Sequence, residues 1–376
     1  MILKRMLKEE WRTQSKMYKG RYLAALPVII FSMTFIGSHI VTGFSTAPTT
    51  DLGLLIMAFG FFTGLAAGSI GFNSSDAAQN ILGDSNFLIF SSRTLPVEKS
   101  RLLANFLVKD LIFYIGLYLL PVGLAVSIVS AEMITYTAYM AGLFLLGLTL
   151  SLITASSAIR LPSRKSFLNY DNVPIPPLAR KSVLDVSRSS GGLFKILMSM
   201  FVLLGLYWYI VNYVPIASYL LSKPLLSFSV ILGMMSVTIY NWLNTYDEAS
   251  DYLHLPVDES ELLESKFQAF KVIALIVILP FLAASAVLYG GNILLGTVIA
   301  LTTAYYVGSV TMYEAGLNPN ERMIEGWTFL KFLVLVNALV IPLLALTSLN
   351  TDTLTILGLL VPMIVIGKLM ETFRFE

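Results

Sequence analysis

Asn244, Asp247 and Asp251 are the residues in this sequence whose types and spacing best suit chemistry. Asp247 and Asp251 are four residues apart, so on a helix both carboxylates would lie on one face. Carboxylate oxygens are ligands that Mg²⁺ prefers, and the ion is commonly held between carboxylates and substrate phosphates. The spacing is therefore compatible with a metal-dependent reaction on a diphosphate, at the end of an apolar stretch.

The same segment has two other interpretations. Residues 244–266 contain seven carboxylates and one lysine, which is typical of a solvated helix end or of a surface that contacts another protein. The aspartate pair resembles membrane prenyltransferases, but these carry a second aspartate-rich motif. The later acidic residues here lack that spacing: Glu314, Glu321 and Glu325. We therefore expect Asp247 at a solvated helix end and keep a membrane-embedded, Mg²⁺-dependent transferase using Asp247 and Asp251 as the alternative.

Other signals of catalysis or cofactor binding are missing from the sequence. It has no cysteine, and its two histidines, His39 and His254, have no second His or Cys at metal-ligand spacing. The nearest approach to a phosphate-binding loop ends in Gly367-Lys368 but continues with leucine. We expect no catalytic site, no metal and no cofactor in this chain, and a net charge of +2 argues against nucleic acid as a partner.

The composition identifies the lipid bilayer as the solvent. Of the 376 residues, 56% are hydrophobic and only 13% are charged, too few to cover a water-soluble domain. A helix needs about 20 mainly apolar residues to cross the hydrocarbon core. Ten stretches qualify: 22–43, 52–72, 103–129, 135–157, 194–214, 220–243, 267–289, 292–312, 328–348 and 352–370. The sequence predicts an all-α, polytopic transmembrane helix bundle of about ten spans, with a kink at Pro121.

The distribution of charge predicts the orientation. Lysines and arginines gather in residues 1–21, in the long connections and beside them, whereas the short connections carry almost none. By the positive-inside rule the long connections and both termini face the cytoplasm, which predicts a multi-pass protein of the cytoplasmic membrane. The leader has a helical apolar pattern, so we expect a basic amphipathic helix along the inner interface. Its apolar side comprises Leu3, Leu7, Trp11, Gln14 and Tyr18.

An internal repeat links the two halves of the chain. The segment Leu95–Leu103 matches Leu255–Leu263 at six of nine positions, and the offset is 160 residues. The same offset places the first four spans roughly on spans five to eight, a sign of duplicated helix units. The predicted organisation is a leader at 1–21, a four-span repeat at 22–157, a basic linker at 158–193, a second repeat at 194–312 and two final spans at 313–376.

The repeated segment has a physical interpretation of its own. Leu-Pro excludes helix before the proline and favours a new helix after it, and Asp258 and Glu261 have the spacing of a capping box. We expect a short cytoplasmic elbow with its charges outward and Leu262-Leu263, or Leu102-Leu103, toward the bilayer. The alternative is that Leu-Pro-Val is only a convenient way of re-entering the membrane.

The basic leader with Glu9-Glu10-Trp11-Arg12, the first pair of spans and the Leu-Pro-Val segment resemble permease subunits of ATP-binding-cassette transporters of the type-2 exporter family. The resemblance implies an ATPase-coupling role for this segment, a separate ABC ATPase subunit that binds ATP, and an unknown substrate. The implied coupling residues are Leu95, Pro96, Val97, Glu98 and Arg101, with Leu255, Pro256, Val257, Asp258 and Glu259 in the second copy. The family usually has six spans, so a homodimer or a paired permease stays open here.

Two further patterns concern packing within the membrane. Gly60, Gly64 and Gly68 recur at four-residue spacing, which lets another helix approach to backbone contact. The neighbour belongs to the same chain or to a second subunit, and the sequence leaves this open.

Lys109 and Asp110 lie inside the third span, and adjacent residues on a helix point in different directions. We expect them to extend to the inner interface rather than to pair or bind substrate.

Overall fold

The computed structural model describes residues 2–17, 21–82, 105, 108–109, 111–158, 175–188, 192–247, 252, 256–322, 326–349 and 351–375. These residues form helices and their connections, without a strand among them, which confirms the predicted all-α bundle. In the described chain nine helices are long and apolar enough to cross a membrane, and a shorter apolar segment, Met200–Tyr213, accompanies them. Helices dominate because backbone groups in hydrocarbon must bond within their own segment.

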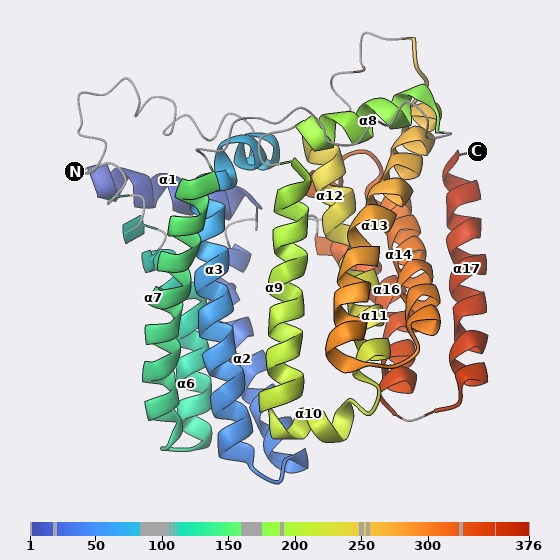
Figure 1. Ribbon diagram of the computed structural model, residues 1–376. Helices are drawn as coiled ribbons and strands as arrows, with labels where there is room; N and C mark the ends of the chain where they lie inside the picture. The colour runs from blue at the N-terminus through green and yellow to red at the C-terminus, as the bar shows by residue number, and fades with distance from the viewer. Residues whose placement is uncertain are drawn as a thin grey trace. The chain divides into compact units, whose positions relative to one another are not determined.

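The helices follow the predicted spans closely, and each of the ten predicted stretches contains helix (Figure 1). Their bounds are α1 Ile2–Met17, α2 Arg21–Phe44, α3 Pro48–Leu82, η2 Ile115–Leu119, α6 Leu120–Val129, α7 Met133–Ala158, α8 Pro177–Arg188, α9 Gly192–Tyr213, α10 Pro215–Leu220, α11 Pro224–Met234, α12 Ser236–Tyr246, α13 Glu259–Tyr289, α14 Ile293–Ala315, α15 Pro319–Arg322, α16 Gly326–Ser348 and α17 Thr353–Phe375. The chain divides into two compact units. Unit 1 comprises Met1–Pro162 and Tyr209–Ser218, and unit 2 comprises Ser163–Trp208 and Tyr219–Glu376.

In unit 1, α3 and α7 pack at backbone contact through glycines. A Cβ atom at Gly60 would overlap the carbonyl oxygen of Met140, and one at Gly64 would overlap that of Phe144. Gly147 of α7 faces the carbonyl oxygen of Phe61 in the same way. The helix that approaches Gly60 and Gly64 therefore belongs to the same chain, because these glycines are covered by α7. The surroundings of Gly68 lie outside the described side chains.

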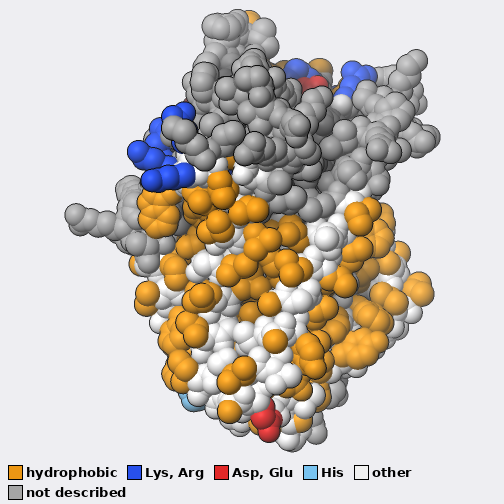
Figure 2. All heavy atoms as spheres, turned by 90° about the vertical axis from the view of Figure 1, so that its left-hand side faces the viewer, with side chains coloured by type: hydrophobic (Ala, Val, Ile, Leu, Met, Phe, Trp, Pro, Cys, Tyr) orange, Lys and Arg blue, Asp and Glu red, His pale blue; other side chains and the backbone are white. Residues whose placement is uncertain are grey.

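The surface of unit 1 is apolar over the spans and basic at α1. Figure 2 shows hydrophobic side chains over a broad face, with Lys and Arg side chains gathered toward one end. Exposed apolar side chains of α2 alone include Val28, Ile29, Met33, Ile36, Ile40 and Phe44. The leader forms the predicted helix, α1, with Met6 buried and its basic residues Lys4, Arg5, Lys8 and Arg12 exposed. Such a surface suits contact with lipid chains and a polar interface.

The third span is irregular where Pro121 predicts a kink. The π-helical turn η2, Ile115–Leu119, lies directly before α6, in which Pro121 is the second residue. Proline has no N–H to donate and its ring crowds the carbonyl four residues earlier, so a wider turn before it relieves the clash. The irregularity therefore has a local cause in the sequence.

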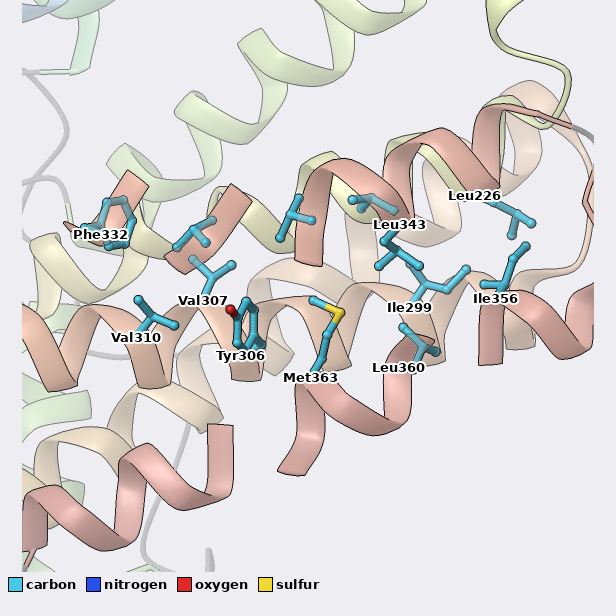
Figure 3. Packing of buried hydrophobic residues seen from close by; sticks show 13 residues of the cluster. Leu226, Ile299, Tyr306, Val307, Val310, Phe332, Leu343, Ile356, Leu360 and Met363 are labelled. Atoms are coloured by element: carbon cyan, nitrogen blue, oxygen red, sulfur yellow. The ribbon is translucent and has the colours of Figure 1, made fainter. Parts of the chain in front are cut away.

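The core of unit 2 is apolar and joins α11, α14, α16 and α17. Figure 3 shows these side chains meeting between the helices. The buried cluster comprises Leu226, Val230, Ile299, Tyr306, Val307, Val310, Phe332, Val336, Val340, Leu343, Ile356, Leu360 and Met363. Tyr306 is the polar member, and its hydroxyl donates to the carbonyl of Leu335 at 2.6 Å. α14 of this core also lies against α12 and α13, which meet at the candidate functional site.

We expect Gly64→Ala to destabilise unit 1 by about 2 kcal/mol, because the added methyl group must push α7 away from α3. Gly142→Ala is the matched control on α7, since a Cβ there meets nothing within 4 Å. That change should leave stability equal or raise it by up to about 1 kcal/mol through helix propensity. Thermal unfolding of the two purified variants in the same detergent measures the difference. Equal unfolding temperatures would contradict the glycine contact.

Candidate functional site

Three helices of unit 2, α8, α12 and α13, meet where α12 ends and α13 begins. α8 starts at Pro177, in the first helical turn where proline is tolerated, and buries Ala179, Val183 and Val186 on one face. Their spacing of three or four residues makes α8 amphipathic, and the helix lies against both α12 and α13. The buried side of α8 therefore closes over the start of α13.

A single carboxylate joins these three helices. Asp247, the residue after α12, accepts a hydrogen bond on Oδ1 from Lys181 Nζ of α8 at 2.9 Å and from the Tyr252 hydroxyl at 2.8 Å. Its Oδ2 accepts from Lys266 Nζ of α13 at 2.9 Å and from the Ser182 hydroxyl. The side chains of Asp247 and Lys266 are both 0% exposed. We call these five residues the Asp247 cluster.

Asp247 and Lys181 keep their charges at neutral pH. Burial by itself raises the pKa of the Asp247 carboxyl group, but the charge of Lys266 and the hydrogen bonds from Lys266, Ser182 and Lys181 lower it to about 2. Burial lowers the pKa of Lys181, yet its hydrogen bonds to Tyr252, Asp247 and Asp185 raise it overall. Asp247 is therefore ionised and Lys181 protonated throughout the physiological range, so the ion pair between them persists over that range.

The expectation that Asp247 lies at a solvated helix end is wrong. The residue is 1% exposed, because α8 and α13 cover it with cations and hydroxyl groups that replace water. These four donors also occupy the positions at which Mg²⁺ would bind. Asn244 is likewise buried and donates to the carbonyl of Tyr240 at 2.9 Å, whereas Asp251 lies outside the described residues. No group of three metal-ligating side chains occurs in the described chain.

An acidic surface lies on the first two turns of α13, beside the buried cluster. Its members are four exposed carboxylates, the N-cap residue Asp258 and the helical residues Glu259, Glu261 and Glu264. In the same turns Leu262 and Leu263 are buried, at 5% and 2% exposed, and Glu259 is exposed although it shares their side of the helix because it is the first residue of α13. We call these four acids the α13 acidic face. The helix thus presents charge outward while its inner side is held by packing and by Lys266.

The second Leu-Pro-Val copy behaves partly as predicted. α13 begins at Glu259 with Asp258 as its N-cap residue, so the predicted helix start after Pro256 is confirmed. The Asp258 side chain makes no capping hydrogen bond, so the capping box is not formed. The prediction that Leu262 and Leu263 face the bilayer is wrong, because both are buried within unit 2. Pro256 and Val257 are described, whereas Leu255 and the whole first copy, Leu95 to Arg101, lie outside the described residues.

Sequence reasoning missed four members of the cluster: Lys181, Ser182, Tyr252 and Lys266. Lys181 and Ser182 lie in the stretch 158–193, for which the charge pattern predicts a basic linker. The apolar spacing that forms α8 is a usable signal, and Pro176-Pro177 marks its start. Lys266 is a lone cation among carboxylates just before an apolar span, and a charge in that position is retained only if it is paired.

Comparison of the chain with models of known protein families, with curated proteins and with solved structures found no match.

We expect Asp247→Asn to destabilise unit 2 by about 3 to 5 kcal/mol, because it leaves the buried Lys266 without a counter-charge. Asp185→Asn is the matched control. It removes a carboxylate that lies 2.9 Å from the same Lys181 but is 36% exposed, so its loss should cost less than about 1 kcal/mol. Adding Lys266→Met to Asp247→Asn should recover part of the loss. Thermal unfolding in detergent tests the series, and equal effects of the two asparagine variants would refute the buried pair.

The pH dependence of stability has a definite sign. The pKa of Asp247 falls from 3.8 to about 2 on folding, so its contribution is complete above pH 4 and disappears as the pH drops toward 2. That contribution is about 2 kcal/mol, since one pH unit is worth about 1.4 kcal/mol. Unfolding temperatures of the wild-type chain and of Asp247→Asn should therefore differ by a constant amount from pH 5 to 8, and the difference should narrow below pH 4. A gap that shrinks already near neutral pH would contradict this assignment.

Proposed function

We propose that this chain is the membrane permease subunit of an ATP-binding-cassette transporter and moves a substrate across the cytoplasmic membrane with energy from a separate ATPase subunit. The observation that carries the proposal is the α13 acidic face, which is anchored from behind by the Asp247 cluster. An exposed charged helix start tied to several helices is what a coupling element needs. The resemblance of the Leu-Pro-Val segments to coupling loops supports the same assignment.

The cluster explains how a push on α13 would be transmitted. Lys266 bonds to both the carboxylate and the backbone carbonyl of Asp247, so the start of α13 cannot move away from the end of α12 without exposing a buried charge. Lys181 adds α8 to the same link. A force on the acidic face would therefore move three helices together as a rigid body. α13 then continues without a break to Tyr289, across a full membrane span.

A permease of this kind takes its energy from ATP bound outside this sequence, because the sequence contains no phosphate-binding loop. A separate ATPase subunit that docks on the acidic face would need basic residues at its surface, since opposite charges steer association and set specificity. This arrangement requires the end of unit 2 that carries α8 and the start of α13 to face the cytoplasm, in agreement with the charge distribution along the chain.

The transferase alternative gains no support from the structure. Its first ligand, Asp247, is paired with two lysines, a tyrosine and a serine. A membrane scaffold without transport activity is the competing class, and it is separated from a permease by the presence or absence of an ATPase partner. The decisive experiment therefore concerns the docking surface.

We expect the double variant Glu259→Lys/Glu261→Lys to lose the ATPase that co-purifies with the wild-type chain in mild detergent, by about tenfold or more, because two like charges replace two attractive ones. Asp352→Lys is the matched control, since Asp352 is an exposed acid of unit 2 in the connection between α16 and α17. It should keep the ATPase. The same reversal at Glu98 and Arg101 in the first copy tests whether both copies dock a subunit.

Two results would overturn the proposal. One is that no ATPase accompanies the wild-type chain under any mild extraction, which favours the scaffold. The other is that the Glu259/Glu261 double variant and Asp352→Lys retain the ATPase equally, which removes the acidic face from coupling. Unfolding temperatures of both variants should match the wild type, since all three side chains are exposed.

A further inference from the structure

Two arginines of unit 2 converge on one glycine at the end of α14. A Cβ atom placed on Gly316 would lie 2.7 Å from Nη2 of Arg374 and 4.0 Å from Nη1 of Arg322. Arg374 comes from the last turn of α17, and Arg322 from the last turn of α15. α14 lies against both of these helices. Two guanidinium groups from different segments therefore lie over the same stretch of backbone.

Neither arginine has a counter-charge among the side chains that the structure describes. Glu371, one turn before Arg374, is bound instead to Lys271 at 3.1 Å, Lys368 at 3.2 Å and the Tyr305 hydroxyl at 2.6 Å. The Nε atom of Arg374 is buried without a hydrogen-bond partner. Two like charges so close together repel each other, and a buried guanidinium nitrogen without an acceptor costs free energy. Among the described side chains, no carboxylate supplies the anion that this arrangement calls for.

The backbone at Gly316 is shaped to leave room for these side chains. Gly316 has φ +62°, a conformation that L side chains rarely adopt, and its missing Cβ leaves the space that Arg374 occupies. Its carbonyl oxygen accepts a hydrogen bond from the Tyr240 hydroxyl at 2.9 Å. Tyr240 therefore already supplies one hydrogen bond to this end of α14.

We propose that Arg322 and Arg374 bind a phosphate group at the Gly316 end of α14. Guanidinium groups suit phosphate because their planar forks donate two parallel hydrogen bonds to its oxygens, and two arginines would share its negative charge. The phosphate would supply both the counter-charge and an acceptor for the buried Nε of Arg374. This inference is independent of the transport function, since it rests on the convergence of two arginines at Gly316 and on the buried Nε of Arg374.

The surroundings favour a phospholipid headgroup as the source of the phosphate. Phe373 and Leu369, beside Arg374 on α17, are 68% and 50% exposed and would contact acyl chains. Basic pockets between helix ends at the membrane surface are a recognised way of holding anionic headgroups. Soluble inorganic phosphate offers the same chemistry, so the experiment must distinguish the two sources.

Native mass spectrometry of the full-length chain, extracted and then titrated with phosphatidylglycerol, phosphatidylcholine or inorganic phosphate, provides the test. For a lipid site, phosphatidylglycerol should bind to the wild-type chain in one strong step, and Arg322→Gln/Arg374→Gln should weaken that step about tenfold or more. Inorganic phosphate that binds with the same dependence on both arginines would assign the site to a soluble phosphate. Either result supports a phosphate site.

Lys331→Gln is the matched control. It removes one positive charge from an exposed side chain of α16 whose cation lies 5.8 Å from the Trp327 ring. Arg322→Lys/Arg374→Lys is a second variant, which keeps the charge but not the planar fork and should bind more weakly than the wild type. Equal binding by the wild type, the lysine variant and the glutamine variant would overturn the proposal. So would the absence of any phosphate-dependent step in the wild-type chain.

Discussion

A buried carboxylate needs hydrogen-bond donors and a counter-charge from the protein in place of water. Asp247 has both at the point where three helices meet. Its partners come from α8, from α13 and from the connection between α12 and α13. Each of these segments supplies a donor to the buried carboxylate, so Asp247 links all of them. The junction of α8, α12 and α13 therefore combines one buried charge with the apolar contacts that α8 makes.

Both units have an apolar core between their helices, and further contacts add to it. In unit 1, glycines of α3 and α7 remove side chains from the contact, so that backbones touch and dispersion forces act over a long, close surface. In unit 2, an apolar core fills the space between α11, α14, α16 and α17, and the ionic contacts described above lie at the helix ends. Charges at helix ends cost less to keep than charges in mid-span, since polar headgroups and water lie close by.

In the proposed permease, a fixed ionic link is compatible with movement because the helices that it joins would move together. The Asp247 cluster makes α8, the end of α12 and the start of α13 a single mechanical piece. An ATPase subunit that contacts the α13 acidic face would then move all three of these segments and not α13 alone. The arginines at Gly316 lie on other helices of the same unit, where a lipid phosphate would hold α14, α15 and α17 together.

The sequence by itself determined the spans, because the length and apolarity needed to cross hydrocarbon are local properties: the stretch 22–43 became α2 at Arg21–Phe44. It also determined that α13 would start after Pro256, since the constraint that proline imposes is local as well. It could indicate a close helix neighbour at Gly60 and Gly64, but spacing on one helix carries no information about which helix packs against it. Only the tertiary structure decided that α7 does.

The tertiary structure alone also decided whether Asp247 is solvated or buried. The acidic stretch around it predicts solvation, yet its partner Lys181 is 66 residues away in the chain and sits on a helix where the charge pattern predicts a linker. Whether a carboxylate is solvated or buried depends on what packs over it, and that is a property of distant segments brought together by folding. For the same reason the sequence did not predict that Arg322 and Arg374 lie near Gly316. They come together there because α15 and α17 both lie against α14.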